Sequence, residues 1–472
     1  MSFLYESLAQ ELRGSILTGT LKAGDKLPSL RHMGRSRGLS LATVMEAYAL
    51  LEAEGHLEAR PQSGFYVRRA RRAPLPHSAQ TLQAPAEVRS DRFINEILAA
   101  IRQPGMLMLA STSLDQALLP NTALARLLHS CALRQPFNYY EDSCGHAELR
   151  RQIAQRTLDT PSPLGADELV ITAGCMEAIT FSLRCVARPG DVIAVESPAF
   201  YGILQTIEGQ GMQALEIPSD PIKGLDLTLL ARAVEDYPVK ALVTVPSFHN
   251  PLGYCMPPAS KRILVEMLTS RGIAIIEDDI YGEFYYDYDQ PPPTLRSFDS
   301  SGLVLLCSSF SKTLAPGLRI GWAAPGRFYE EFLHQKRMHS ISTATLPQQA
   351  LAAYLRRGAY ERHLRGLRRV LQANLQRLVS GVEQHFPAGT RLSRPVGGVV
   401  LWIELPAPAS AMELYGLALN AGIAIAPGPM FALRREPGHD FSHCLRLSCG
   451  LPWNEATDQA IARLGRLAAG LC

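Results

Sequence analysis

The sequence predicts an α/β protein made of a small helical N-terminal domain and a large domain built on a mostly parallel sheet. The length of 472 residues suits two or three domains. Helical periodicity dominates the start of the chain, whereas short apolar runs alternate with helical stretches from about residue 168 onward. Residues 69–92 carry neither period and are expected to form an exposed linker. The expected domain boundaries are therefore 1–68 and 93–472.

The composition is that of a globular protein, with 47% hydrophobic and 19% charged residues, and it excludes a largely disordered chain. No apolar run reaches the roughly 18 residues needed to span a membrane. The start, MSFLYESLAQEL, lacks the basic region of a secretory signal, so a cytoplasmic protein is expected. The nine cysteines are odd in number and no pair has CxxC spacing, so neither a disulfide scaffold nor a metal site is expected.

The first 68 residues predict three helices and a hairpin. An apolar residue at every fourth position predicts an amphipathic helix over 4–18. Ser29 is expected to cap a short second helix that ends near Gly38, and Ser40 to cap a third that ends near Gly55. The run HLEARPQSGFYVRR predicts a β-hairpin. This is the plan of a winged helix-turn-helix domain, in which the third helix enters the major groove of DNA.

The charge pattern agrees with a DNA-binding head. Residues 1–72 hold 11 Lys and Arg against 7 Asp and Glu, so they carry the excess positive charge of a chain whose net charge is +3. We expect base contacts from the start of the third helix, phosphate contacts from the second helix, and further contacts from the tip of the hairpin. The residues concerned are Ser40, Leu41, Ala42, Thr43, Arg31, Arg35, Arg37, Gln62, Ser63 and Gly64. The alternative is a helical cap or dimerisation module with solvated arginines.

The segments LYESLAQELRGSILTGTLKAGDKLPSLRHMG and TVMEAYALLEAEGHLEARPQSGFYV closely resemble the DNA-binding domain of the GntR family of bacterial regulators, over residues 3–68. The resemblance implies the fold and the phosphate contacts. The family often has Arg directly after the Ser that opens the recognition helix, but here Leu41 follows Ser40. Leucine cannot make the bidentate contact to guanine, although it can touch a thymine methyl.

In the large domain, polar residues follow five strand-like runs: ELVIT, DVIAVE, ALVTV, GIAIIED and GLVLLCSS. In parallel sheets ligands gather at the carboxyl ends of the strands. The first run leads through Gly174 into a helical stretch, a turn that exposes backbone N–H groups to an anion. The other runs lead to Phe200, Asn250, Asp278 and Lys312. These side chains are therefore expected to meet at one edge of the sheet.

Lys312 is one of only seven lysines, and among them it alone follows a strongly apolar strand and stands among serines. With Arg319 nearby, its pKa should be depressed, so that it can form a Schiff base with an aldehyde. An Asp at a neighbouring strand end, such as Asp278, can pair with a pyridinium nitrogen. These are the groups that pyridoxal 5′-phosphate (PLP) requires. The alternative for Lys312 taken alone is a surface lysine with a buried stem.

The motifs DDIY, HNPLG, SPAFYG and SSFSKTLAPGLRIGW resemble those of class I aminotransferases of PLP fold type I, over roughly residues 100–470. The resemblance implies a large PLP domain with a smaller C-terminal α/β subdomain. It implies that Lys312 forms the covalent link to PLP and that Asp278 pairs with the pyridine nitrogen. Tyr281 and Asn250 would hold the ring hydroxyl, and Phe200 would stack on the ring.

The same resemblance implies how the phosphate and the substrate are held. The residues implied at the phosphate are Gly174, Cys175, Met176, Ser309, Ser311 and Arg319. Arg446 would grip a substrate α-carboxylate, and Tyr140 would reach the phosphate of the neighbouring subunit, which implies a homodimer with shared sites. Two departures from the family pattern are Cys175, where a hydroxylic or amidic residue is common, and Leu114, where Gly-Pro-Asp patterns are usual.

A GntR-like DNA-binding domain followed by an aminotransferase-like domain resembles the layout of the MocR subfamily of transcription regulators. It implies a PLP-bearing dimer that binds double-stranded DNA and senses PLP or an amino compound, whose binding would reposition the heads on DNA. A rival reading is a working aminotransferase whose head is vestigial or only a tether. A third is an architectural DNA-binding protein that uses PLP only for folding. The head has not lost Arg31, Thr43 or Gly64, which favours the regulator.

Overall fold

The computed structural model describes residues 4–60, 63–68, 73–78, 82–88, 92–100, 103–286, 290–434 and 441–472. Gln62 lies outside them, so its expected DNA contact has no structural counterpart here. Within the described residues, no helix is long and apolar enough to cross a membrane, and no cluster of potential ligands could hold a metal ion.

The N-terminal domain has the predicted three helices and hairpin. They are α1 (Leu4–Leu17), α2 (Leu30–Arg37), α3 (Leu41–Ala53), β1 (Leu57–Arg60) and β2 (Gly64–Val67). Both predicted N-caps are confirmed, because the Ser29 side chain accepts the N–H of His32 and the Ser40 side chain accepts that of Thr43. Gly38 closes α2 in the left-handed conformation. A core of its own, which includes Leu12, Val44, Tyr48, Leu51 and Leu57, holds the domain together.

The main sheet of the large domain follows the order β3-β7-β6-β9-β10-β11-β12-β5, and β8 pairs with β7. Strands β7, β6, β9, β10 and β11 are mutually parallel, whereas β12 is antiparallel to both its neighbours. The five apolar runs are confirmed as strands of this sheet. Its strands are β3 (Ala86–Glu87), β5 (Val170–Thr172), β6 (Val192–Ser197), β7 (Gln213–Asp220), β8 (Gly224–Leu225), β9 (Val239–Thr244), β10 (Ala274–Asp278), β11 (Val304–Ser309) and β12 (Gly321–Ala324).

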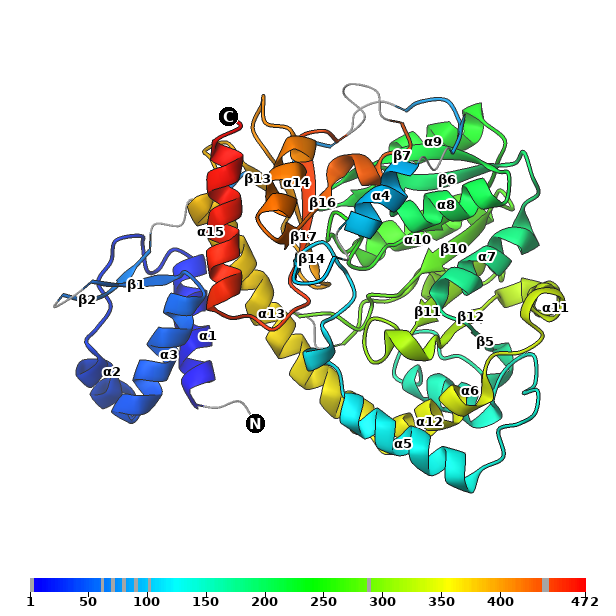
Figure 1. Cartoon of the computed structure of the whole chain (residues 1–472), viewed down its shortest axis with the longest axis horizontal. Coiled ribbons are helices and arrows are strands. Elements are labelled where there is room, and N and C mark those ends of the chain that lie inside the picture. The colour runs from blue at the N-terminus through cyan, green and yellow to red at the C-terminus, as the bar shows by residue number, and fades with distance from the viewer. Residues whose placement is uncertain are drawn as a thin grey trace.

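Helices cover this sheet and continue into a smaller subdomain. Those of the large domain are α4 (Arg92–Ala100), α5 (Asn121–Arg134), α6 (Ala147–Arg156), α7 (Cys175–Val186), α8 (Tyr201–Gly209), α9 (Leu227–Asp236), α10 (Pro258–Thr269), α11 (Tyr329–Ser340) and α12 (Thr345–Arg356). The long helix α13 (Ala359–His385) then runs from beside α12 to the smaller subdomain (Figure 1).

The smaller subdomain is the C-terminal α/β unit that the sequence predicts. It contains an antiparallel sheet in the order β13-β14-β17-β16, and a short parallel pair, β15 with β4. Its elements are β13 (Arg391–Leu392), β14 (Val400–Glu404), α14 (Ala411–Asn420), β15 (Ile423–Ala424), β16 (Ala426–Pro427), β17 (Cys444–Ser448) and α15 (Glu455–Ala469), while β4 (Leu107–Met108) comes from the start of the large domain.

The linker differs from the expected exposed tether. Its residues 86–87 form β3, which adds an antiparallel edge strand to β7. Further upstream, the backbone N–H of Ala73 donates to Glu383 (3.1 Å), and the carbonyl of Pro74 accepts the N–H of Leu392 (2.8 Å). The described parts of the linker therefore lie on the body of the protein. Sequence periodicity missed these contacts because each is made with a residue more than a hundred positions away.

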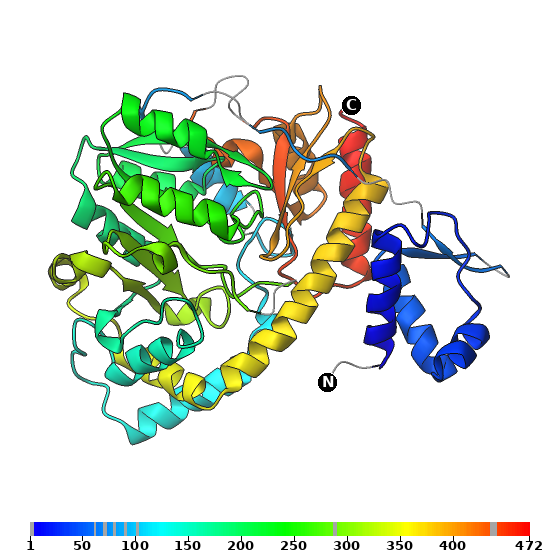
Figure 2. The same cartoon turned by 180° about the vertical axis from the view of Figure 1, so that it is seen from behind.

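The head lies at one end of the molecule, beside α13 and α15, in both views (Figures 1 and 2). The hydroxyl of Ser380 on α13 donates a hydrogen bond of 2.9 Å to the carbonyl of Glu54 at the end of α3. A Cβ on the next residue, Gly55, would lie 2.7 Å from that hydroxyl. The close approach of head and body at this point therefore requires glycine.

Candidate functional site

The site in the large domain lies where β10 and β11 end. Asp278 is the last residue of β10, and Lys312 follows β11, the parallel neighbour of β10. The Lys312 side chain donates a hydrogen bond of 3.0 Å to Thr112 Oγ1, and the Tyr281 hydroxyl also bonds Thr112. The fold thus brings three of the expected residues together. Thr112 was not singled out in the sequence, because it lies 200 positions before Lys312 in a loop without a motif.

The electrostatics of the site keep Lys312 reactive. Burial, followed by the positive charge of Arg446, lowers the pKa of Lys312 to about 8, although the charge of Asp278 acts in the opposite direction. A lysine with this pKa holds a much larger neutral fraction near pH 7 than an ordinary lysine does. Because the neutral amine is the nucleophile, Lys312 is prepared to attack an aldehyde.

Asp278 is the buried anion of the site. Burial raises its pKa to about 6, while a hydrogen bond from the Cys175 thiol to Oδ1 (3.2 Å) and the charge of Lys312 oppose the rise. The carboxylate therefore stays mostly ionised near pH 7, as a partner for a pyridinium nitrogen must. The Cys175 thiol itself stays protonated, because burial and the Asp278 charge raise its pKa well above the usual value. Cys175 thus contributes a side chain as well as the expected backbone.

An anion cradle is formed by the turn between β5 and α7. Gly174 has φ +95° and no side chain caps the helix that starts at Cys175, so the N-terminus of α7 is open to a ligand. Arg319 donates to the carbonyl of Ala173 (3.0 Å) and to Ser311 Oγ (3.3 Å). A Cβ at Gly174 would collide with the Arg319 guanidinium. The cradle is thus shaped by glycine and has the charge that a phosphate needs.

Hydroxyl groups complete the cradle. Ser309 Oγ lies 2.7 Å from Ser311 Oγ and accepts the N–H of Ser311 (2.9 Å). The fold therefore joins Ser309, Ser311 and Arg319 with the start of α7, as expected. Met176, the second residue of α7, is half-buried at the same helix end. The donor set fits the phosphate of PLP.

Arg446 supplies a second anion site on β17 of the smaller subdomain. It is 3% exposed, donates to Asn250 Oδ1 (2.7 Å) and to the carbonyl of Ala110, and lies over the Phe431 ring. Its Nε has no hydrogen-bond partner, and no carboxylate of the described residues pairs with it. A buried guanidinium in this state is stabilised by an anion, so Arg446 fits the carboxylate of a substrate or effector.

A buried contact between a histidine and a carboxylate lies next to Asn250 in the chain. His249 Nε2 lies 3.2 Å from the carboxylate of Glu196 on β6, and both side chains are almost fully buried. The Glu196 carboxylate also accepts from Thr244 Oγ1 (2.7 Å) and from the Tyr254 hydroxyl. Burial acts to raise the pKa of Glu196, but the charge of His249 and these hydrogen bonds hold it below the usual value. His249 belongs to the motif HNPLG, but its pairing with Glu196, 53 positions earlier, was not predicted from the sequence.

Two aromatic residues stand at the start of α8. Phe200 precedes the helix and its ring lies 4.7 Å from that of Tyr201, centroid to centroid. A Cβ on Gly202 would lie 2.6 Å from the Phe200 ring, so glycine is required for the position of this ring. Tyr201 interacts electrostatically with both Arg446 and Tyr281, which places it in the same site. Tyr201 was not predicted from the sequence.

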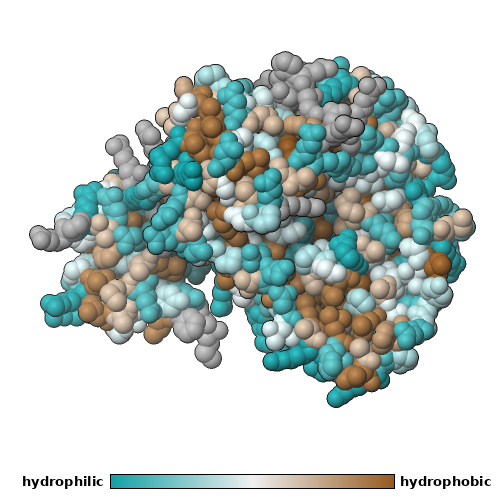
Figure 3. All heavy atoms as spheres, in the orientation of Figure 1, coloured by the Kyte–Doolittle hydropathy of each residue, from teal (hydrophilic) through white to brown (hydrophobic). Residues whose placement is uncertain are grey.

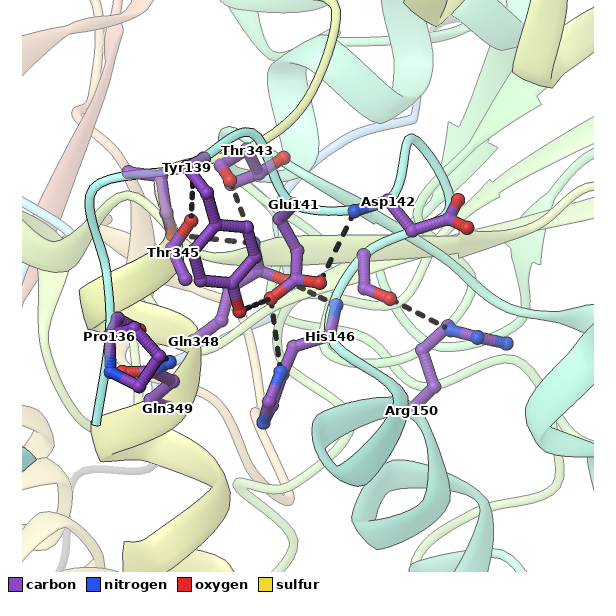
Figure 4. A network of polar contacts seen from close by, with 12 residues as sticks. Pro136, Tyr139, Glu141, Asp142, His146, Arg150, Thr343, Thr345, Gln348 and Gln349 are labelled. Atoms are coloured by element: carbon purple, nitrogen blue, oxygen red, sulfur yellow. Dashed lines mark hydrogen bonds and ion pairs between the residues drawn. The ribbon is translucent and has the colours of Figure 1, made fainter. Parts of the chain in front are cut away.

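Tyr140 is not part of the site of its own chain. Its side chain is 80% exposed, on a loop whose neighbouring residues are anchored to the body of the protein (Figure 4). Thr345 donates to the carbonyl of Tyr139 (3.2 Å) and Gln349 to that of Pro136 (3.0 Å). The Glu141 carboxylate accepts three hydrogen bonds, from the Tyr139 hydroxyl and from two groups further along the loop, Asp142 N and His146 Nδ1. A firmly held loop therefore presents Tyr140 outward.

In the head, the expected DNA-facing residues lie on one set of exposed elements. Arg31 and Arg35 are exposed on α2, whereas Arg37 is paired with Glu11 at 2.5 Å. Leu41 is 51% exposed at the start of α3, and Met45 one turn later is 54% exposed. An exposed apolar pair at the start of a recognition helix suits contact with thymine methyl groups.

The other expected DNA contacts fall at the capped start of α3 and on the hairpin. Thr43 donates its backbone N–H to Ser40 at the cap, and Ala42 is exposed beside it. On the hairpin, Ser63 Oγ lies 2.7 Å from the Tyr66 hydroxyl, and Gly64 begins β2 with φ +102°. Lys26 and Arg60 flank the Tyr66 ring, and they are additional basic residues on the hairpin side that were not predicted from the sequence.

Comparisons with known proteins match both parts of the chain. Residues 4–67 match the family model of bacterial regulatory proteins of the gntR family, and residues 104–464 match that of aminotransferases of class I and II. Two relatives are the HTH-type transcriptional regulators YjiR and YdcR of Escherichia coli, 36% and 38% identical, each over 98% of both chains. A third is the 2-aminoadipate transaminase of Thermus thermophilus, 30% identical over 80% of this chain and 94% of its own.

Among solved structures, LysN, an α-aminoadipate aminotransferase of Thermus thermophilus complexed with N-(5′-phosphopyridoxyl)-L-leucine, has a TM-score of 0.73 at 27% identity. The match covers 81% of this chain and 95% of that one. The part of the chain without a counterpart in this structure thus has about the size of the head and linker.

Proposed function

The chain belongs to the MocR subfamily of GntR-family transcription regulators, which join a DNA-binding head to an aminotransferase class I and II domain, and we propose that its large domain senses PLP or an amino compound and passes this binding on to the head. The head is a DNA-binding domain and the large domain a PLP-binding domain. We place the protein in the cytoplasm, where its proposed target DNA lies.

We assign PLP to the strand-end site. Lys312, Asp278, Tyr281 and Asn250 would hold the aldehyde and the ring, with Phe200 against the ring face. The phosphate would lie in the cradle formed by Gly174, Cys175, Met176, Ser309, Ser311 and Arg319. When bound, PLP supplies an electrophilic carbon for primary amines and an electron sink. Because the pKa of Lys312 is lowered, its amine can act there as a nucleophile when neutral and can accept or donate a proton.

The observation that carries the sensing proposal is the unpaired, buried guanidinium of Arg446. Among the described residues its Nε has no hydrogen-bond partner and no carboxylate pairs with it, and the side chain is buried. Arg446 shares one site with Lys312, whose pKa it lowers. An amino acid has both complementary groups, an amine for the cofactor and a carboxylate for Arg446. The site is therefore best suited to an amino compound that also carries a carboxylate.

A route from this site to the head runs through the smaller subdomain. Arg446 lies on β17, which belongs to the sheet of that subdomain. The subdomain packs on α13, and Ser380 of α13 bonds the end of α3 in the head. An effector that binds one placement of the subdomain more tightly than another would shift the placement of the head by at most this difference in binding free energy.

We propose that two copies of the chain form the working unit. Tyr140 is held outward by its anchored loop, in a position suited to reach the phosphate cradle of a partner. Apolar side chains gather on the surface over α5 (Figure 3). Exposed apolar residues of this region and of the end of α11 are Leu133, Phe137, Tyr139, Tyr140, Met338 and Ile341. A surface of this kind supports a protein–protein interface, and two heads would suit two DNA half-sites.

The proposed function is tested by DNA binding. Full-length PLP-loaded protein is titrated against labelled DNA from upstream of its own gene and against a scrambled fragment of equal length, at physiological salt. We expect at least about a thousandfold preference for the first fragment, the lower end of the usual range of specific regulators. The titration is then repeated with single amino acids, and one of them should change the affinity. Equal weak binding to both fragments would contradict the regulator assignment for this DNA.

A second candidate function is transamination, and the complete site favours it. Lys312, Asp278 and Arg446 are all present in one site, and a transaminase is among the relatives. The test is to incubate the protein with each amino acid and a 2-oxo acid and to follow amino-group transfer. Turnover by the wild-type protein that is lost in Lys312→Ala would establish catalysis alongside regulation. Absence of turnover, together with amino-acid-dependent DNA binding, would leave sensing as the function.

A further inference from the structure

A second cavity lies next to the PLP site, on the other side of Asp278. It has a volume of about 580 Å³ and is enclosed by α6, the residues 290–297, and the start of α13. Asp278 faces Cys175 in the PLP site, whereas its neighbour Asp279 lines this cavity. Only Ser309 is common to the cavity and the phosphate cradle. The size falls within the range of small-molecule sites.

The charge at the inner end of the cavity is unbalanced. Among the described residues, none makes a hydrogen bond or ion pair with the Asp279 carboxylate. Its neighbour Glu277 is satisfied by the backbone N–H groups of Leu295 (2.7 Å) and Arg296 (3.1 Å). Lys261 interacts with both carboxylates, but its ammonium donates to Ser247 Oγ and to the Pro293 carbonyl, each at 2.7 Å. One fully buried carboxylate, Glu277, and one half-buried carboxylate, Asp279, therefore face one ammonium.

This imbalance disfavours the charged form of Asp279. Burial, followed by the charge of Glu277, raises the pKa of Asp279 well above its usual value. A cation bound at Asp279 would remove this penalty, because an opposite charge at close range favours the ionised form. The inner end of the cavity is thus complementary to a positive group.

The arginines of the cavity cannot supply that positive group, because acidic residues already hold them. Arg156 is paired with Glu283 and Glu361, and Arg296 is paired with Glu168 at 2.5 Å. The remaining wall contains the aromatic side chains of Trp322 and Phe310. Tyr285 and Tyr360 also line it, but each already has an arginine guanidinium over its ring. Aromatic faces attract organic cations and cover apolar groups. One free carboxylate and an aromatic wall describe a site for an organic ammonium ion.

We propose that this cavity binds a small organic ammonium compound, with its cationic nitrogen at Asp279 and its apolar body against the aromatic wall. The site is separate from that of the amino compound proposed above, and its occupation does not depend on that proposal. It is also connected to Lys312. Ser308 Oγ donates to the Asp279 carbonyl (3.0 Å), the Asp279 N–H donates to Cys307 (2.9 Å), and this strand leads directly to Lys312. A ligand here is therefore placed to influence the PLP site, and reciprocally.

The test uses N,N-dimethylphenethylamine, a tertiary amine that carries a cation but cannot form a Schiff base with PLP. Binding to the full-length PLP-loaded protein is measured by titration calorimetry at pH 7.5. We expect saturable binding of one molecule per chain, and at least tenfold weaker binding by Asp279→Asn. The matched control is Asp159→Asn, which changes an exposed carboxylate on the rim of the same cavity and should alter the affinity less than twofold.

A neutral analogue of similar shape, 2-methyl-4-phenylbutan-2-ol, should bind at least tenfold more weakly than the amine. Equal affinities of amine and alcohol, or of wild type and Asp279→Asn, would overturn the proposal. A crystal of the wild-type protein soaked with the 4-bromo derivative of the amine gives an answer that needs no variant. The bromine peak is expected in the cavity, and a peak found only in the PLP site or on the surface would also overturn the proposal.

Discussion

Asp278 and Asp279 are adjacent in the sequence, yet their surroundings give them different properties. Asp278 receives a hydrogen bond from Cys175 and the attraction of Lys312, and its pKa is about 6. The Asp279 carboxylate accepts no hydrogen bond among the described residues, and although Lys261 attracts it, burial and the charge of Glu277 raise its pKa well above the usual value. Burial raises the pKa of both, so the difference between the two carboxylates comes from their partners. At the residue scale, the chemistry of this site therefore depends on contacts that the motif DDIY does not encode.

Replacement of Lys312 tests the covalent attachment of PLP. Lys312→Ala should abolish the product that borohydride fixes covalently to the chain, while the protein keeps its fold. The matched control is Lys240→Ala, which changes an exposed lysine on β9 and should retain the product in full. Mass spectrometry after reduction checks both. A borohydride-fixed product in Lys312→Ala would assign the link to another lysine.

The rate of PLP uptake should depend on pH through Lys312. Its pKa of about 8 lies below the usual 10.5, so the neutral amine increases as the pH rises through 8. Uptake of PLP by cofactor-free protein, followed by absorbance from pH 6.5 to 9.5, should accelerate about tenfold per pH unit below the pKa and level off above it. A rate that is constant over this range would contradict the lowered pKa.

Arg446 should discriminate amino acids from simple amines. Arg446→Lys keeps the charge but loses the two-pronged guanidinium, a change worth about 1.5–3 kcal/mol, or roughly 10- to 100-fold in affinity. The variant should bind an amino acid more weakly by this factor. It should bind the corresponding amine, which lacks the carboxylate, with unchanged affinity. Absorbance titrations of the PLP-loaded protein measure both. An equal loss for the two ligands would mean that the variant has disturbed the site in general.

At the scale of elements, features that depend on neighbouring residues could be predicted from the sequence, whereas features that depend on long-range contacts could not. The caps at Ser29 and Ser40 depend on neighbours three residues away, so the sequence predicts them, and the five apolar runs predict the central strands. Strand β3 in the linker, and Thr112 beside Lys312, depend on partners far along the chain. A two-residue edge strand has no period to detect, and a single threonine in a loop has no motif.

Helix α2 carries a prediction of its own because its arginines differ in pairing. Arg31 is exposed, whereas Arg37 already pairs with Glu11. Arg31→Ala should weaken DNA binding and reduce the slope of log affinity against log salt by about one. Arg37→Ala should have a smaller effect, since its charge is partly neutralised in the free protein. DNA titrations at several salt concentrations measure the slopes, and an unchanged slope for Arg31→Ala would remove it from the phosphate contacts.

At the scale of the whole molecule, the head meets the body at the end of α3. There Ser380 bonds Glu54, close to Gly55, and Glu52 and Arg68 face α13 and α15 across a pocket. The linker, in contrast, is held along the smaller subdomain and the edge of the main sheet. We propose that the head changes its placement while the body, with the described parts of the linker, stays intact. Regulation of this kind requires a small free-energy difference between the placements.

The shared site of the proposed dimer can be tested by mixing two defective chains. Tyr140→Phe removes the hydroxyl expected to reach the partner's phosphate, and should weaken PLP binding about tenfold or more. Lys312→Ala removes the covalent link in its own chain. If each site takes Lys312 from one chain and Tyr140 from the other, a mixed dimer has one site with both defects and one complete site. Co-unfolding and refolding the two variants should therefore restore tight, borohydride-fixable PLP in the mixture. A mixture that equals the sum of the separate variants would show that Tyr140 serves no neighbouring site.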